Sequence, residues 1–308
     1  MRFASLFLLL CACAEDPIEL NPIELKVTAY NVLCSFCGNG HFDDDPYDDW
    51  GTRLPHLQAQ LAAFDADLIG LQELLYTFPN DARGIRDEVA DLGGRGDVYA
   101  SVYYERDPSD INSSMDYPDA TILYRKAMFE KTRHGQVWLS PTPDTAFSTG
   151  FDPGGQLPRL VFWAEFKIID REQSLIFATT HVDNNSPSQE LSSPLIRSRL
   201  KSIAGDLPVI LVGDFNSDLT HPAYLDLTQN ADWPLSDTWS MAQQPRATGD
   251  AQRIEAYPFE LRIDHIFVHP ENSFEVLDWN IDLSSYSEGS RMPSDHRPIN
   301  AKLRLLTD

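Results

Sequence analysis

The sequence predicts an α/β protein, and three features of its pattern support this prediction. Short runs rich in β-branched and aromatic residues alternate with segments whose apolar residues recur at helical spacing. Proline and glycine separate these segments, and the chain contains no internal repeat. A length of 308 residues with 42% hydrophobic residues is enough to bury a substantial core. We therefore expect one globular domain over residues 25–308, after a short tether of residues 14–24.

The expected strands are short segments in which β-branched, aromatic or aliphatic residues predominate. They comprise residues 25–30, 67–71, 98–104, 120–124, 136–139, 160–168, 174–180, 209–212, 262–268 and 299–306. The expected helices carry apolar residues three or four positions apart, which places those residues on one helical face. They contain Leu54, Leu57, Leu61 and Phe64; then Ile85, Val89 and Leu92; and finally Leu191, Leu195, Ile196, Leu200 and Ile203.

The N-terminal residues have the layout of an export signal over residues 1–13. Arg2 precedes an apolar run at residues 3–10, and small residues follow. The run is too short to span a bilayer. Ala12-Cys13-Ala14 fits ordinary cleavage, but Leu10-Cys11-Ala12-Cys13 resembles a lipoprotein box, the interpretation that the short signal favours. We expect export, with the protein either secreted or periplasmic, or lipid-anchored to the cell envelope through Cys13.

Two cysteines, Cys34 and Cys37, lie outside the signal. In an exported protein a Cys-x-x-Cys pair favours a local disulfide. A zinc site with His41 would still need a fourth ligand. The stretch from Cys34 to Trp50, with five aspartates in residues 43–49, predicts a solvated loop rather than a calcium-binding EF-hand, whose ligand spacing it lacks.

The charge of the chain is strongly negative. It has 24 Lys and Arg against 47 Asp and Glu, which gives a formal net charge of -23. Such a charge repels polyanions and argues against a broad nucleic-acid-binding face. The negative charge does not exclude substrates that contain phosphate, because a bound cation can reverse the local field inside an acidic pocket.

Polar side chains that can bind metal or phosphate occur at the ends of several apolar strands. They are Asn31, Glu73, His181, Asp214 with Asn216, Asp264, and Asp295 with His296. Each one alone is also consistent with a turn, a helix cap or a satisfied polar group. Together they supply carboxylates for a hard cation, a base, and donors to a developing negative charge. This combination is what phosphoester hydrolysis requires.

Six sequence blocks, in this order, resemble the motifs of the endonuclease/exonuclease/phosphatase superfamily, to which deoxyribonuclease I belongs. They are Thr28-Ala29-Tyr30-Asn31, Ile69-Gly70-Leu71-Gln72-Glu73, Thr180-His181-Val182-Asp183, Gly213-Asp214-Phe215-Asn216, Arg262-Ile263-Asp264-His265-Ile266 and Ser294-Asp295-His296. Residues 138–144, and Pro158-Arg159 before residues 162–164, are similar to a bacterial branch. The resemblance implies a four-layer α/β sandwich: two mixed β-sheets packed face to face, helices outside, and the blocks at one rim.

The resemblance also implies a metal site. Glu73, with Asn31 and Asp295, would hold Mg²⁺ or Mn²⁺ as the cofactor. Similar proteins often carry a Glu just before the strand at residues 120–124, where this chain has Pro118-Asp119. The missing Glu puts a second acid/base pair at the site in doubt, but it does not affect the expected metal site.

The remaining motif residues would carry out the reaction. Asp214 would activate the attacking water, and Asn216 would orient the water or the phosphate. His296, oriented by Asp264, and His181 would bind phosphate oxygens and stabilise or protonate the transition state. Arg159 would bind substrate with the histidines.

The expected activity is therefore that of an exported, divalent-metal-dependent phosphoester hydrolase, acting as a monomer. The negative charge favours small or lipid-borne phosphoesters over long duplex DNA. Alternatives are a deoxyribonuclease-like nuclease, a phospholipid hydrolase similar to secreted sphingomyelinases, and a catalytically silent binding module. The last is disfavoured because a binding module has no need to hold a metal ligand, a base and phosphate donors together.

Overall fold

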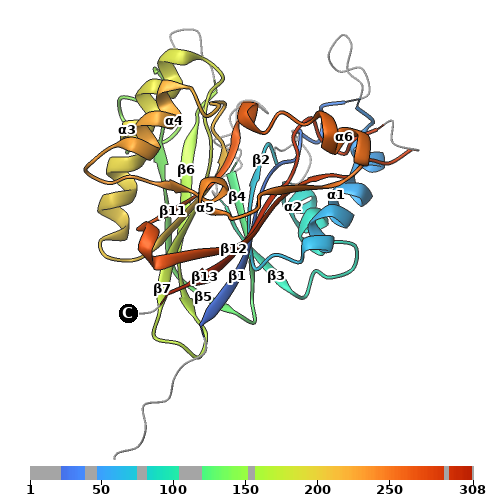
Figure 1. The fold of residues 1–308 in the computed structure, drawn as a ribbon, viewed down its shortest axis with the longest axis horizontal. Coiled ribbons are helices and arrows are strands. Elements are labelled where there is room, and N and C mark those ends of the chain that lie inside the picture. The colour runs from blue at the N-terminus through green and yellow to red at the C-terminus, as the bar shows by residue number, and fades with distance from the viewer. Residues whose placement is uncertain are drawn as a thin grey trace, which may run out of the picture.

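The computed structural model describes residues 22–38, 47–74, 82–103, 120–151, 157–287 and 291–306. Two mixed β-sheets pack face to face, and helices cover their outer faces (Figure 1). This arrangement confirms the expected four-layer sandwich. The predicted signal, His41 and Asp119 lie outside the described residues. Among the described helices, none combines the length and the apolar character needed to cross a membrane.

The first sheet has seven strands, and β1 lies near its centre. Their order is β10 (Arg246–Gly249), β12 (Phe274–Leu283), β13 (Ile299–Leu305), β1 (Ile23–Asn31), β2 (Leu68–Gln72), β4 (Ala120–Arg125) and β3 (Tyr99–Tyr103). Strand β1 runs parallel to β2 and antiparallel to β13. The carboxyl ends of β1 and β2 therefore meet at the same edge of the sheet.

The second sheet has six strands and contains a similar parallel pair. Their order is β5 (Phe129–Trp138), β6 (Leu160–Ile168), β7 (Ser174–His181), β8 (Val209–Asp214), β11 (Asp264–His269) and β9 (Ser236–Asp237). Strands β7 and β8 are parallel, and β11 pairs antiparallel with β8. The carboxyl ends of β7 and β8 thus adjoin the start of β11.

The main core lies between the two sheets. Large side chains such as Phe162, Phe177 and Trp279 are almost completely buried there. Burial of each such side chain stabilises the fold by about 1.5–3 kcal/mol. Gly70 of β2 permits a close approach of the two sheets, because a Cβ at this position would lie 2.2 Å from the Val212 side chain of β8. A larger residue at this position would push the two sheets apart.

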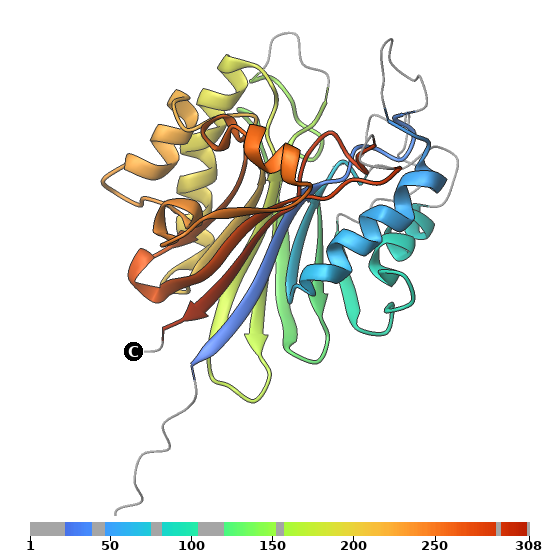
Figure 2. The ribbon, with the colours of Figure 1, turned by 45° about the vertical axis from the view of Figure 1, so that its right-hand side comes forward.

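Helices bury their apolar faces against the outsides of the sheets. Helices α1 (Trp50–Phe64) and α2 (Ala82–Asp91) flank the first sheet, whereas α3 (Ser186–Ala204) and α4 (Pro222–Gln229) flank the second (Figure 2). Helix α1 begins at a favourable cap, since the Asp49 carboxylate accepts from the Thr52 N–H at 3.0 Å. Shorter elements connect the layers: α5 (Thr238–Met241), α6 (Ala251–Ala256), η3 (Phe259–Leu261) and η4 (Glu271–Ser273).

The structure differs from the sequence-based expectations at several elements. Strand β5 is ten residues long, whereas only its last part was expected, and β11 begins at Asp264 rather than at residue 262. Strand β12 was not expected, because a register shift between Val276 and Asp278 breaks its alternation. Leu191 was placed on the apolar face of α3 but is 48% exposed.

Candidate active site

The ends of the two parallel strand pairs bring the candidate site residues together. Asn31 ends β1, and Glu73 directly follows β2. His181 ends β7 and lies opposite Asp214, which ends β8. Asp264 starts β11, opposite Asp214 on its other side. The sequence could indicate that these residues end strands, but the facing of the two sheets places them around one point.

Asp214 is at the centre of this group and is almost fully buried. Its Oδ2 lies 3.1 Å from the Asn31 amide nitrogen, which donates to it. The same oxygen lies 3.4 Å from His181 Nε2 and 3.5 Å from His296 Nε2. Its Oδ1 accepts from the Asn216 N–H at 2.9 Å. One carboxylate therefore contacts four other residues that the motifs predicted.

His296 and Asp264 form a close pair. His296 Nδ1 donates to Asp264 Oδ2 at 2.7 Å. Burial opposes the charged form of His296, but the nearby carboxylates of Asp264 and Asp214 outweigh it and hold the pKa of His296 well above its ordinary value. Asp264 Oδ1 is buried and accepts no hydrogen bond from the described residues. An unsatisfied buried oxygen of this kind is suited to a water, substrate or cation.

His181 is held by a chain of polar contacts that the sequence did not indicate. Arg159 Nη1 donates to His181 Nδ1 at 2.9 Å. Because a guanidinium only donates, Nδ1 must accept, and the ring proton therefore lies on Nε2, facing Asp214. Arg159 Nε pairs with Asp183 Oδ1 at 2.9 Å, and Asp183 Oδ2 accepts from Ser188 Oγ at 2.9 Å. Arg159, predicted to bind substrate, thus also orients His181.

Removal of the Asp183 carboxylate is expected to lower turnover without unfolding the protein. Asp183→Ala deprives Arg159 of its ion-pair partner, so the guanidinium no longer fixes the His181 ring, and kcat should fall roughly tenfold. Asp226→Ala is a matched control, because Asp226 pairs with Arg197 between α3 and α4. Equal kcat values for the two variants in steady-state assays would contradict the positioning role.

The two site asparagines use their amide nitrogens within the protein. Asn31 Nδ2 donates to Glu73 Oε1 at 3.0 Å as well as to Asp214, and its Oδ1 accepts from the Leu33 N–H at 3.1 Å. Asn216 Nδ2 donates to the Val182 carbonyl at 2.8 Å. These bonds hold Asn216 beside Val182, whereas Asn31 fixes the Glu73 carboxylate.

Two groups of residues have ligand atoms close enough to share a cation. One comprises Asp214, Asp264 and His296, and the other comprises Cys34, Cys37 and Glu73; these are the groups of three or more among the described residues. Cys34 and Cys37 form the expected disulfide, so they offer no thiolates. In this group Glu73 alone can therefore bind a cation, through its carboxylate oxygens. Asp295 is exposed and precedes His296 in the loop before β13.

A cleft of about 360 Å³ opens beside the carboxylates of Asp264 and Asp295. Its walls are formed by the segment from Arg253 to Asp264 and by the Asp295–Arg297 turn. The sequence indicated only the end of this segment, Arg262 to Asp264, because α6 and η3 are short and carry no motif. The volume is at the small end of the range for ligand pockets. The cleft is large enough for one compact organic group.

Comparisons with known proteins agree with this geometry. A model of the Endonuclease/Exonuclease/phosphatase family matches residues 28–296. A solved structure of a family protein from Bacteroides thetaiotaomicron is 29% identical, covers 94% of this chain and 100% of its own, and has a TM-score of 0.72. A mannosyl-6-phosphatase from the same organism is 26% identical, covers 91% and 99%, and has a TM-score of 0.69.

A more distant structure shares the fold alone. The human Nocturnin catalytic domain with bound sulfate is 14% identical, covers 92% of this chain and 95% of its own, and has a TM-score of 0.64. No curated protein matches the chain. The family match spans all six motif blocks, from Thr28 to His296. The chain therefore belongs to the endonuclease/exonuclease/phosphatase family.

Proposed function

We propose that this protein is a divalent-metal-dependent hydrolase of small phosphoesters. The observation that carries the proposal is the position of Asp214, a buried carboxylate within 3.5 Å of Asn31, His181 and His296. A base surrounded by phosphate-binding donors is what attack of water on a phosphoester needs. Family membership supports the same class of reaction.

The proposed roles follow from the contacts of each side chain. Asp214 accepts a proton from the attacking water, and the Asn216 amide oxygen orients that water. His181 offers its Nε2–H to a phosphate oxygen, because Arg159 occupies its other nitrogen. His296, paired with Asp264, donates from Nε2 to the phosphate and passes its proton to the leaving oxygen.

The residues present fit a hard divalent cation. Glu73 and Asp295 offer carboxylate oxygens, and the Asn31 amide lies beside Glu73. Oxygen ligands without thiolates favour Mg²⁺ or Mn²⁺. We assign the cation to Glu73 with Asp295, and to Asn31 if its amide turns its oxygen outward. His296 is left out of the ligand set, because the proposed reaction uses its Nε2–H as the donor to the phosphate and the leaving oxygen. When bound, the cation supplies positive charge to the phosphate oxygens.

Chelation is expected to abolish turnover. Excess chelator removes the cation from Glu73, and the site loses charge that the protein's own donors cannot replace. Added Mg²⁺ or Mn²⁺ should restore activity to the same preparation, measured as release of alcohol from a chromogenic phosphoester. Full turnover in excess chelator would contradict the assignment.

The substrate is proposed to be a compact phosphoester rather than a polymer. The cleft of about 360 Å³ has room for one small group, and the net charge of -23 opposes a long polyanion. The mannosyl-6-phosphatase among the similar structures supports a small monoester. A panel of sugar phosphates, inositol phosphates, sphingomyelin, RNA and DNA distinguishes these classes, so a nuclease or a phospholipid hydrolase would be detected directly.

The response to salt should also distinguish a small substrate from duplex DNA. Duplex binding weakens with a logarithmic slope of about 0.9 per phosphate neutralised. We expect rates on the best small substrate to change less than about twofold between low and moderate salt, because few charges are involved. Duplex DNA as the best substrate, with cleavage that weakens steeply as salt rises, would contradict this proposal. Export, a lipid anchor at Cys13 and a monomeric state stay predictions from the sequence.

A further inference from the structure

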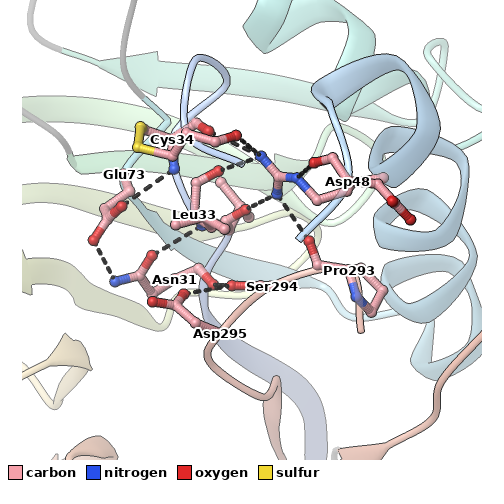
Figure 3. Close-up of a disulfide and its surroundings, with 11 residues drawn as sticks. Asn31, Leu33, Cys34, Asp48, Glu73, Pro293, Ser294 and Asp295 are labelled. Atoms are coloured by element: carbon pink, nitrogen blue, oxygen red, sulfur yellow. Dashed lines mark hydrogen bonds between the residues drawn. A yellow bond between two sulfur atoms is a disulfide. The ribbon is translucent and has the colours of Figure 1, made fainter. Parts of the chain in front are cut away.

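Arg53 of α1 is a fully buried arginine that binds the main chain around the site. Its Nε donates to the Asp48 carbonyl at 2.9 Å, and its Nη1 donates to the carbonyls of Val32 and Pro293 at 3.0 and 2.8 Å. Its Nη2 donates to the carbonyls of Leu33, Cys34 and Cys37. Three segments distant in sequence therefore meet at one guanidinium (Figure 3).

The loop after β1 depends on this side chain for its hydrogen bonds. Residues 32–37 leave the sheet, so their buried carbonyls need partners outside the strand ladder. A guanidinium offers five N–H donors in a rigid fork, whereas a lysine offers three from one point. Burial of a charge costs several kcal/mol unless its donors are satisfied. Arg53 meets both requirements, and a lysine at this position could not reach the same carbonyls together.

The Cys34–Cys37 disulfide closes the same loop and lies beside Glu73. The Cys34 N–H donates to Glu73 Oε2 at 3.2 Å, while Asn31 donates to Oε1 at 3.0 Å. Glu73 itself has a φ of 58°, an uncommon conformation for a residue other than glycine. The orientation of its carboxylate therefore depends on the loop that the disulfide and Arg53 hold.

The guanidinium of Arg53 also contacts the loop that carries His296. Besides the bond to the Pro293 carbonyl, Ser294 Oγ donates to the Asn31 carbonyl at 2.7 Å and accepts from the His296 N–H at 3.2 Å. The disulfide itself joins two residues of the loop after β1. Arg53 thus holds both sides of the site, whereas the disulfide holds one.

We propose that Arg53 and the Cys34–Cys37 disulfide are positioning groups that set the affinity of Glu73 for its cation. Arg53 additionally positions the His296 loop, so it influences turnover even when the cation is saturating. The disulfide acts on cation affinity, and raising the cation concentration compensates for its loss. This inference rests on the proposed role of Glu73 as a metal ligand.

The test measures Mn²⁺ binding without substrate, from the loss of the free-ion signal in electron paramagnetic resonance. Residues that orient a ligand typically change metal affinity by about 10–100-fold when replaced. The double variant Cys34→Ser/Cys37→Ser should bind Mn²⁺ at least about tenfold more weakly and recover turnover as Mn²⁺ is raised. Arg53→Lys should bind more weakly to a similar degree and keep a turnover deficit at saturating Mn²⁺.

A matched control separates positioning from general stability. Arg125 binds Asp65 and Asp67 at the amino end of β2, opposite Glu73, with contacts of 2.8 and 2.9 Å. Arg125→Lys should lower the melting temperature and leave Mn²⁺ affinity unchanged. The double cysteine variant is expected to fold, because so short a loop restricts the unfolded chain little.

The outcomes are distinguishable. Unchanged Mn²⁺ affinity in the folded cysteine variant would overturn the inference, and so would an equal loss in Arg125→Lys. If Arg53→Lys does not fold, the Mn²⁺ affinity of the cysteine variant still tests the inference. If the wild-type protein binds no Mn²⁺, the proposed metal dependence fails, and this inference fails with it.

Discussion

Replacement of Asp214 by asparagine is expected to lower kcat by about 100-fold or more, the loss typical of a catalytic base. The substitution keeps the shape of the side chain and its contact with the Asn216 N–H. It removes the negative charge and most of the basicity of the oxygen that faces His181 and His296. The measurement is kcat at saturating Mg²⁺, with a thermal melt to show that the variant is folded.

Asp218→Asn is the control for this change. Asp218 lies four residues further along, where its carboxylate accepts from the Thr220 N–H and the Thr220 hydroxyl, both at 2.8 Å. These contacts stabilise a local turn rather than the site. The Asp218→Asn variant should therefore retain wild-type turnover. A folded Asp214→Asn protein with the activity of this control would remove Asp214 from the reaction.

Replacement of His296 by alanine is expected to produce a loss of similar size, about 100-fold or more in kcat. The change removes the donor that faces the phosphate and leaves Asp264 as a buried carboxylate without its partner. Asp264→Asn should have a smaller effect, since the imidazole stays in place but loses its strongest orienting contact. Steady-state assays of both variants on one substrate give this ranking.

His269→Ala is the matched control, because His269 lies at the other end of β11 and bonds to the Pro234 carbonyl at 2.7 Å. It should leave kcat within about twofold of the wild-type value. The double variant Asp214→Asn/His296→Ala should be only slightly worse than either single variant, because residues that act as a unit lose activity non-additively. If the loss in the double variant equals the product of the two single losses, Asp214 and His296 act independently.

Much of the site could be predicted because its residues end strands with clear patterns. Asn31 and Glu73 follow apolar runs that became β1 and β2, and Asp214 follows the run that became β8. Motif order then indicated which polar residues belong together. What the pattern could not provide was the facing of the two sheets, which depends on close approach at Gly70 and on packing far away in sequence.

Side-chain partners were harder to predict than positions. Arg159 carries a charge suited to phosphate, but its contacts with Asp183 and His181 exist only in three dimensions. Arg53 went unnoticed because a charged residue on a helix usually faces solvent. A signal was present, since Arg53, Leu57 and Leu61 are four residues apart and lie on the buried face of α1.

Strand β12 shows the limit of periodicity itself. Its residues alternate in burial up to Val276, and after the register shift the sequence presents Asp278 and Trp279 in the opposite phase. A bulge of this kind moves every following side chain to the other face, so a strict period of two fails. Only pairing with β13 shows that the segment is one strand.

The most direct test of the central claim is a turnover assay on the phosphoester panel with Mg²⁺ or Mn²⁺, run side by side on wild-type protein and Asp214→Asn. We expect the wild-type protein to hydrolyse a small phosphoester fastest, and the variant to lose about 100-fold of that rate. Absence of hydrolysis of every phosphoester by folded, metal-loaded wild-type protein would contradict this claim. Equal rates for the two proteins would do the same.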